Sequence, residues 1–185
     1  IRPQTTAASL AAMPPSFAPL AVQYAAALDG PIDHRHTIGH APPICDGAGL
    51  ALVGGAPGTA AKPRARIMAY AESGGDPHAS LLAGFTAMER VLAKTGLTLA
   101  DMDRIEFMEA FAVTIAKFLR DCPVDTARVN VGGGHIARGQ PMGASGAILV
   151  STLLDALDAA DGRLGLVVCS GAAGVGAAMV VERLG

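Results

Sequence analysis

Two glycine-rich segments carry the polar residues best placed to do chemistry. The first runs from Val129 to Gly146 as an apolar strand, a turn that carries His135 and Gln140, and the start of an apolar helix. The second begins at Cys169, directly after another apolar strand. Such turns aim backbone N–H groups and a few side chains into a pocket, which suits the oxyanion of an acyl group. Two turns of this kind in one small chain predict a shared site.

Cys169 is the candidate for an acid or base that acts on a carbon next to a carbonyl group. Its position at the entrance of a glycine-rich turn predicts an exposed thiol with a lowered pKa. The competing interpretation is a small apolar residue in a packed corner, a common environment for cysteine.

Three further polar residues are candidates for the same site. Glu109 precedes an apolar helix, where a carboxylate either braces the site or interacts with the helix dipole. His135 and Gln140 lie inside the glycine-rich loop and are expected to contact a ligand. His40 follows Thr-Ile-Gly and is either part of the site or a residue of a surface turn.

Size and charge limit the class of protein. The chain has 185 residues, of which 51% are apolar, so it can bury a sizeable core. With 14 basic and 16 acidic residues its net charge is −2, and it has no basic stripe for nucleic acid. His34 and His36 lack further ligands at suitable spacing, so no metal site is expected.

The cysteines and apolar stretches predict a reducing, cytoplasmic environment with no membrane contact. Cys45, Cys122 and Cys169 are an odd number without metal-ligand spacing. The first thirty residues lack a secretory signal. The apolar stretch 165–181 is interrupted by glycines, which favours strand–turn–strand over a membrane span.

Hydrophobic periodicity predicts alternating strands and helices, as in a layered α/β fold. Strands are expected at 64–71, 104–107, 128–131, 164–169 and 175–182. Helices are expected at 81–95, 110–119 and 144–157, the last being apolar on nearly all sides and therefore central. Near the N-terminus we expect a short helix, a strand end at 37–40, and a short helix running into a buried strand at 45–53. The Gly/Pro/Ala-rich stretch 54–63 is the expected boundary.

Taken together, these segments resemble the thiolase family over the whole chain. The opening Ile1–Thr6 is similar to the segment before the last strand of the family's N-terminal domain. Four motifs carry the rest of the resemblance: Thr37-Ile-Gly-His40 with Asp46-Gly-Ala48, Met108-Glu-Ala-Phe-Ala112, Gly139-Gln-Pro-Met-Gly-Ala-Ser-Gly146 and Cys169-Ser-Gly171. The family has Thr-Ala-Gly-Asn with Asp-Gly-Ala, Asn-Glu-Ala-Phe-Ala, Gly-His-Pro-x-Gly-Ala-Ser-Gly and Cys-x-Gly at these places.

The resemblance implies the second half of a thiolase with a layered α/β/α/β/α fold. Residues 1–35 would end the loop domain, 36–57 would complete the N-terminal core domain, and 58–185 would form the C-terminal core domain. The family's nucleophilic cysteine belongs to the first half. Because Ile1 is not an initiator Met, we expect a processed subunit or a fragment, with the nucleophile on an N-terminal half or partner chain. The family acts on coenzyme A thioesters in lipid metabolism, forms oligomers and holds no tightly bound cofactor.

The resemblance also assigns roles, and the chain departs from the family where those roles matter. A cysteine matching Cys169 moves the α-proton of the acceptor thioester. The family's activating histidine is Gln140 here, which can donate a hydrogen bond but cannot take a proton near pH 7. The asparagine that positions a water is Met108, a second asparagine is Gly132, and the family's Asn and Ser are His40 and Pro42.

Three functions therefore remain open. The first is an acyltransferase with modified chemistry, in which Cys169 is the acid/base, Gln140 an oxyanion donor, Glu109 a brace, and His40 or His135 a relocated imidazole. The second is a non-catalytic thiolase-like subunit that binds acyl-coenzyme A or scaffolds a partner enzyme. The third is a ketoacyl-synthase-like or hydroxymethylglutaryl-type condensing enzyme, whose His and Asn patterns are not seen. The expected substrate contacts are Met108, Phe111, His135, Gly139, Pro141, Gly143 and Gly171.

Overall fold

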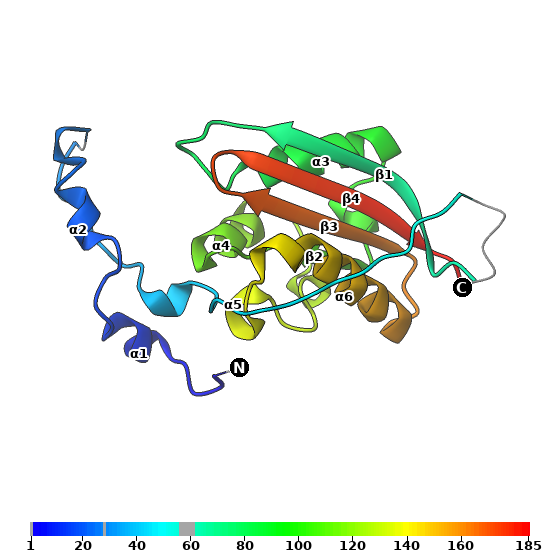
Figure 1. Cartoon of the computed structure of the whole chain (residues 1–185), viewed down its shortest axis with the longest axis horizontal. Coiled ribbons are helices and arrows are strands. Elements are labelled where there is room, and N and C mark those ends of the chain that lie inside the picture. Colours follow the sequence, from blue (N-terminus) through cyan, green and yellow to red (C-terminus); the bar gives the residue numbers. More distant parts are fainter. Residues whose placement is uncertain (1, 28, 56–61) are drawn as a thin grey trace.

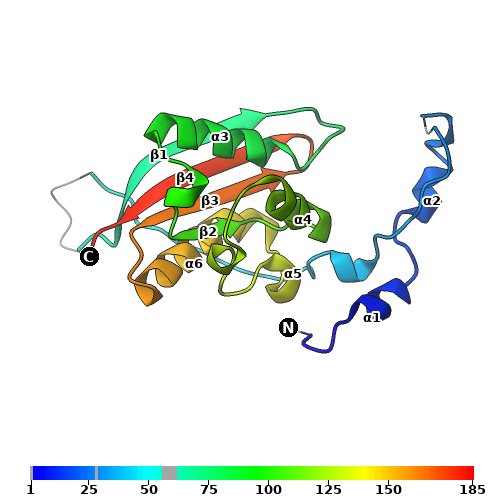
Figure 2. The same cartoon turned by 180° about the vertical axis from the view of Figure 1, so that it is seen from behind.

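The computed structural model describes residues 2–27, 29–55 and 62–185. Figures 1 and 2 show a layered unit, formed by the residues after 62, from which the N-terminal segment extends as an arm. The arm holds only short helical elements: α1 (Ala7–Ala11), α2 (Ala18–Ala21), η1 (Ala25–Ala27) and η2 (Ile38–His40). Thr6 and Ser9 cap α1 by exchanging hydrogen bonds between side chain and backbone, and the expected short helix near the N-terminus is confirmed.

The layered unit is built on a mixed sheet with strand order β1-β4-β3-β2. Its strands are β1 (Ala65–Gly74), β2 (Arg104–Phe107), β3 (Leu164–Gly171) and β4 (Val175–Arg183). β2 and β3 are parallel, whereas β4 is antiparallel to both β3 and β1. The carboxyl ends of β2 and β3 therefore meet at one edge of the sheet, the place where ligands collect in α/β proteins.

Helices α3 (Ala83–Thr95) and α4 (Ala112–Asp121) cover one face of the sheet, as Figure 2 shows. The rings of Phe107 on β2 and Phe118 on α4 stack with their centroids 4.3 Å apart, and Phe85 on α3 lies 5.4 Å from Phe107. Phe107 and Phe118 are completely buried. Gly96 ends α3 with φ of 70°, a left-handed conformation that glycine adopts without strain.

Helix α6 (Ser145–Ala159) covers the other face over β2 and β3, after the short elements α5 (His135–Arg138) and η5 (Met142–Ala144) (Figure 1). Its Leu149, Leu153 and Leu157 are buried against Val167 and Val181 of the sheet. By length and composition alone, Met142–Ala159 is apolar enough to cross a membrane, and 22% of its residues are buried. Packing on the sheet accounts for the apolar residues on one side of this helix only.

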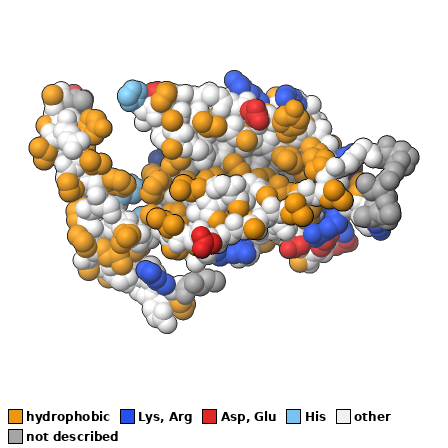
Figure 3. All heavy atoms as spheres, viewed as in Figure 1, with side chains coloured by type: hydrophobic (Ala, Val, Ile, Leu, Met, Phe, Trp, Pro, Cys, Tyr) orange, Lys and Arg blue, Asp and Glu red, His pale blue; other side chains and the backbone are white. Residues whose placement is uncertain are grey.

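Part of the α6 side of the sheet is uncovered and apolar. Ile67 and Tyr70 on β1 are exposed there, and so is Val175 at the start of β4. The extended segment 43–53 crosses α6 and exposes Ile44, Leu50 and other apolar side chains almost completely. Figure 3 shows hydrophobic side chains over this face and along the arm.

The α/β fold expected from the sequence is confirmed, and the predicted helices and the strands 64–71, 104–107, 164–169 and 175–182 agree with the structure within a few residues. Three expectations are wrong. Residues 45–53 form neither helix nor buried strand, residues 37–40 form a 3-10 turn, and 128–131 contributes one parallel bridge, between Val129 and Ile105. Much of the expected boundary at 54–63, including the 57/58 division, lies outside the described residues, so the domain division stays a prediction.

Two long cationic side chains of α3 reach over the edge strand β1. Arg90 donates to the carbonyl oxygen of Glu72 at 2.9 Å, and Lys94 donates to that of Tyr70 at 2.9 Å. Two backbone carbonyl groups of the edge strand are therefore hydrogen-bonded within the same chain.

Replacing Gly176 with alanine is expected to lower the free energy of unfolding by about 1–3 kcal/mol. An added Cβ would overlap with the backbone of Ala83 and Gly84, because the start of α3 packs directly on β4 at this position. Gly171→Ala, in the paired strand β3, is the control: its Cβ would meet Val175 at 3.5 Å, an ordinary contact. Urea unfolding measures both, and equal stabilities of the two variants would contradict this packing.

Candidate active site

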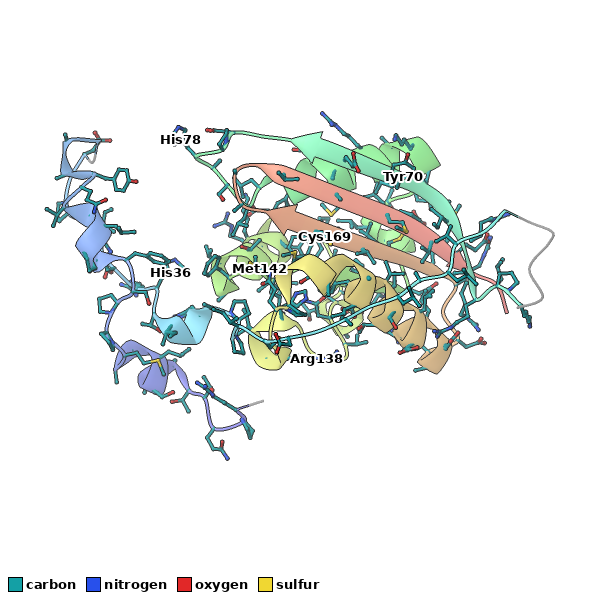
Figure 4. All side chains as sticks on the ribbon, in the orientation of Figure 1. His36, Tyr70, His78, Arg138, Met142 and Cys169 are labelled. Carbon is teal, nitrogen blue, oxygen red and sulfur yellow. The ribbon has the colours of Figure 1, made fainter. Side chains whose placement is uncertain are left out.

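The structure brings Cys169, Met108 and Phe111 together at the carboxyl ends of β2 and β3. Met108 follows β2 directly, and its N–H donates to the carbonyl oxygen of Val168 at 2.9 Å. Met108 is buried, and Phe111 and Cys169 pack against the same apolar cluster. In Figure 4, Cys169 lies on β3 above the first turn of α6.

The Cys169 thiol is half-buried and packs against an apolar cluster. The Sγ atom lies 4.0 Å from the place where a Cβ on Gly146 would be, so the first turn of α6 lies over it. Burial raises the pKa of this thiol to about 11. The expected lowered pKa is therefore wrong, because the cover of α6 and the apolar cluster disfavours the charged thiolate. Near neutral pH the group is a neutral thiol, which can donate a proton but is a poor nucleophile.

A second cluster joins the end of β2 to the glycine-rich loop. The amide of Asn130 pairs with both backbone groups of Phe107, accepting from its N–H at 2.7 Å and donating to its carbonyl at 2.9 Å. Glu109 accepts from the Asn130 amide at 3.2 Å and from the Ile136 N–H at 2.8 Å. Its carboxylate thus caps the first turn of α5, and it packs so closely on Gly134 that a Cβ there would overlap with it. The position of Glu109 suits the expected bracing role.

His135 lies beside Glu109, and it shares a pocket with a residue that the sequence interpretation missed. Only 5% of His135 is exposed, its Nδ1 atom is buried without a hydrogen-bond partner among the described residues, and burial lowers its pKa. Glu106 on β2 is 2% exposed, and burial raises the pKa of its carboxyl group to about 7. The sequence gives no clear signal for this residue, because the alternation of Arg104, Ile105, Glu106 and Phe107 is typical of a strand whose polar side chains face solvent.

The loop with Gln140 packs on the arm. The Gln140 N–H donates to the carbonyl oxygen of Pro43 at 3.1 Å, and the Pro141 ring lies against Gly47. Gly139 has φ of 100° and packs against Cys45, so the close approach and the backbone conformation both require glycine. The arm therefore fixes the position of this loop.

The remaining predicted residues lie at the margins of these clusters. His40 lies in the arm, where its Nδ1 atom bonds to the N–H of Thr37 at 3.1 Å and its ring packs edge-on against His36. Gly171 follows Cys169 along β3, and Gly143 in η5 has open space on its side-chain side. Over the described ranges, no group of three His, Cys, Asp or Glu side chains is arranged to hold a metal ion.

Comparison with known proteins gives consistent matches. The family model for "Thiolase, C-terminal domain" matches residues 61–183. The acetyl-CoA acetyltransferase of Escherichia coli (strain K12) is 41% identical over 151 residues, covering 80% of this chain and 38% of that protein. The acetyl-CoA acetyltransferase of Allochromatium vinosum is 38% identical over 183 residues, or 97% and 43%. The 3-ketoacyl-CoA thiolase of Colwellia psychrerythraea is 34% identical over 191 residues, or 100% and 46%. The chain thus spans less than half the length of these relatives.

Glu109→Ala is expected to loosen the glycine-rich loop. The variant removes the charged acceptor of the half-buried Ile136 N–H and one of the two acceptors of the Asn130 amide, and a hydrogen bond to a charged group contributes about 1.5–3 kcal/mol. Hydrogen exchange at Ile136 should become faster, whereas Glu89→Ala, which removes an exposed acid from α3, should leave it unchanged. Unchanged protection of Ile136 in Glu109→Ala would show that the carboxylate does not hold the loop.

Alkylation of Cys169 by iodoacetamide should be slow in the folded chain. With the pKa raised from 9.0 to about 11, the thiolate fraction at pH 8 falls by about 100-fold. The rate should rise about tenfold for each pH unit up to pH 10. Mass spectrometry of the modified peptide gives the rate, and the urea-unfolded chain supplies the reference for an ordinary thiol. Equal rates in the folded and unfolded chains would refute the burial of this thiol.

Proposed function

Because the chain belongs to the thiolase family, we propose that it forms part of an acyltransferase that acts on coenzyme A thioesters, by thiolytic cleavage or by Claisen-type condensation. The observation that carries this proposal is the position of Cys169 beside Met108 at the carboxyl ends of two parallel strands, beneath the first turn of α6. Coenzyme A enters as part of the substrate, no tightly bound cofactor takes part, and the protein acts in the cytoplasm.

The protonation state of Cys169 supports a defined role. In thiolytic cleavage the bond between the α- and β-carbons breaks, and the α-carbon of the leaving thioester must receive a proton. A neutral thiol with a pKa of about 11 holds that proton near neutral pH. In condensation the same sulfur must first lose its proton, because it then accepts the α-proton of the acceptor thioester. Removing that α-proton places negative charge on the thioester oxygen, and a hydrogen-bond donor has to stabilise this charge.

Gln140 and the two histidines complete the proposed chemistry. The Gln140 carboxamide donates a hydrogen bond to the thioester oxygen but takes no proton, so an imidazole elsewhere must act as the base. His135 suits this role better than His40, because its Nδ1 atom has no partner while that of His40 is bonded to Thr37. Burial keeps His135 neutral near pH 7, as a base must be.

A nucleophilic cysteine would come from an N-terminal thiolase half or from a partner chain in a homo- or hetero-oligomer. The uncovered apolar surface supports such docking. Leu50 is 96% exposed and Ile44 is 95% exposed in the segment that crosses α6, and Ile67 and Tyr70 are exposed on the neighbouring part of the sheet (Figure 3). Burying such side chains against a partner is favourable by roughly 25 cal/mol for each Å² of apolar surface.

A second function, a non-catalytic subunit that binds acyl-coenzyme A or scaffolds a partner enzyme, is favoured by one specific observation. Met108 and Gln140 replace the two polar groups that the thiolase resemblance assigns to water positioning and base catalysis. A buried thioether positions no water, and a carboxamide does not accept a proton near pH 7.

Cys169→Ala is expected to lower the turnover of a 3-ketoacyl-coenzyme A by about 10²–10⁴-fold, because it removes the proton donor. The assay combines the chain with a thiolase half that carries the nucleophilic cysteine and follows thioester cleavage. Cys122→Ala is the matched control, since this half-buried thiol lies at the end of α4, outside the clusters described above.

The same assay separates the two functions. Turnover that survives in Cys169→Ala would remove this thiol from the mechanism. Thioester binding without turnover, both in the natural chain and in Gln140→His, would favour the non-catalytic subunit.

A further inference from the structure

A pocket on the α6 side of β2 shares His135 with the proposed acyl transfer but holds polar groups that this reaction does not use. It has a volume of about 170 Å³, enough for a molecule of a few non-hydrogen atoms. The polar groups that line it come from β2, α5, α6 and the arm: Glu106, His135, Arg138, Thr152 and Asp46. Cys169 and Gln140 do not line it. In Figure 4, Arg138 lies on the opposite side of the start of α6 from Cys169.

One buried polar atom beside this Glu106 pocket lacks a partner. The Nδ1 atom of His135 is buried and makes no hydrogen bond with the described residues. Glu106, which also lines the pocket, is 2% exposed, and burial is the main cause of its raised pKa, while the charge of Arg138 opposes that shift. Buried polar groups in native proteins are normally hydrogen-bonded, so the unpartnered imidazole atom in the wall of a pocket indicates a missing ligand.

The charges around the pocket favour an anion. Arg138 lines the pocket, its charge lowers the pKa of Glu106, and its guanidinium group supplies hydrogen-bond donors. Glu109 is already occupied by its bonds to Asn130 and Ile136, and Asp46 is exposed, so solvent screens its charge. Thr152 of α6 adds a hydroxyl group and no charge. A cation in the pocket would be repelled by the guanidinium of Arg138. Among the described residues, no set of three ligating side chains is arranged to offset that repulsion by binding a metal ion.

We propose that the Glu106 pocket binds a small monocarboxylate, such as formate or acetate, whose oxygens accept hydrogen bonds from Arg138, His135 and the carboxyl group of Glu106. The site shares His135 with the proposed acyl transfer, but acetate binding is measured without turnover and is therefore tested separately. Glu106 donates to the ligand only in its protonated form, and its pKa of about 7 makes that form available at neutral pH. Above this pH, binding takes up one proton from solvent, so the affinity falls as the pH rises.

The test is an NMR titration of the ¹⁵N-labelled chain with sodium acetate. Acetate should shift the amide signals of the pocket residues 133–138 and 152. With a pKa of about 7, the protonated fraction of Glu106 is about tenfold smaller at pH 8 than at pH 6, so the dissociation constant should be about tenfold larger at pH 8. Absence of shifts at pH 6, or an affinity that does not change with pH, would overturn the proposal.

Variants separate the contributions. Arg138→Ala should weaken binding at least tenfold at both pH values, and because Arg138 is exposed the fold should be retained. Arg120→Ala, which removes an exposed arginine from α4, is the matched control and should bind acetate as the natural chain does. Glu106→Gln keeps an N–H donor and should bind acetate without the pH dependence.

Two further outcomes would also overturn the assignment. Unchanged affinity in Arg138→Ala would exclude the guanidinium from the site, and this result does not require Glu106→Gln to fold. Methylammonium, a cation of similar size to acetate, is the control ligand. It should not change the chemical shifts of the same amide signals. Binding of methylammonium in preference to acetate would show that the pocket selects cations.

Discussion

The junction of Asn130 with Glu109 is the interaction on which the candidate site depends. The Asn130 amide occupies both backbone groups of Phe107, which ends β2, and the Glu109 carboxylate then connects that amide to the first turn of α5. One carboxylate thus links the end of a strand, a left-handed asparagine and the glycine-rich loop. Because Met108 lies between Phe107 and Glu109, its place beside Cys169 is set by the same bonds. The closeness of Glu109 to Gly134 leaves this arrangement little freedom.

The helices and the long strands of the layered unit could be predicted because their signals are local. Apolar spacing and Gly96 predict α3, and the predominantly apolar character of 144–157 predicts α6. The segment 45–53 could not be predicted correctly, because apolar spacing does not say whether a neighbouring strand is present to accept its backbone hydrogen bonds. The strand predicted at 128–131 is wrong for a different reason. Asn130 adopts φ of 47°, and its side chain makes the hydrogen bonds to β2 that the backbone of a longer strand would make.

The electrostatics of the candidate site could not be predicted from the sequence. The sequence is enough to place Cys169 at the end of a strand, yet the direction of its pKa shift depends on α6 lying over the thiol. Glu106 was missed because alternation within a strand of four residues does not reveal which face a helix covers. Cys169 does not line the Glu106 pocket, so the raised pKa values of the thiol and of the carboxyl group arise from separate parts of the cover that α6 and its neighbours provide.

The two cations over β1 have a consequence for assembly. An edge strand with free acceptors is a template for pairing with strands of other molecules, and long charged side chains over the strand oppose such pairing. Arg90 and Lys94 occupy the carbonyl groups of Glu72 and Tyr70 from within the chain. Growth of the sheet by strand addition is thereby discouraged along this border, which leaves the exposed apolar side chains on the α6 side of the sheet as a separate kind of surface.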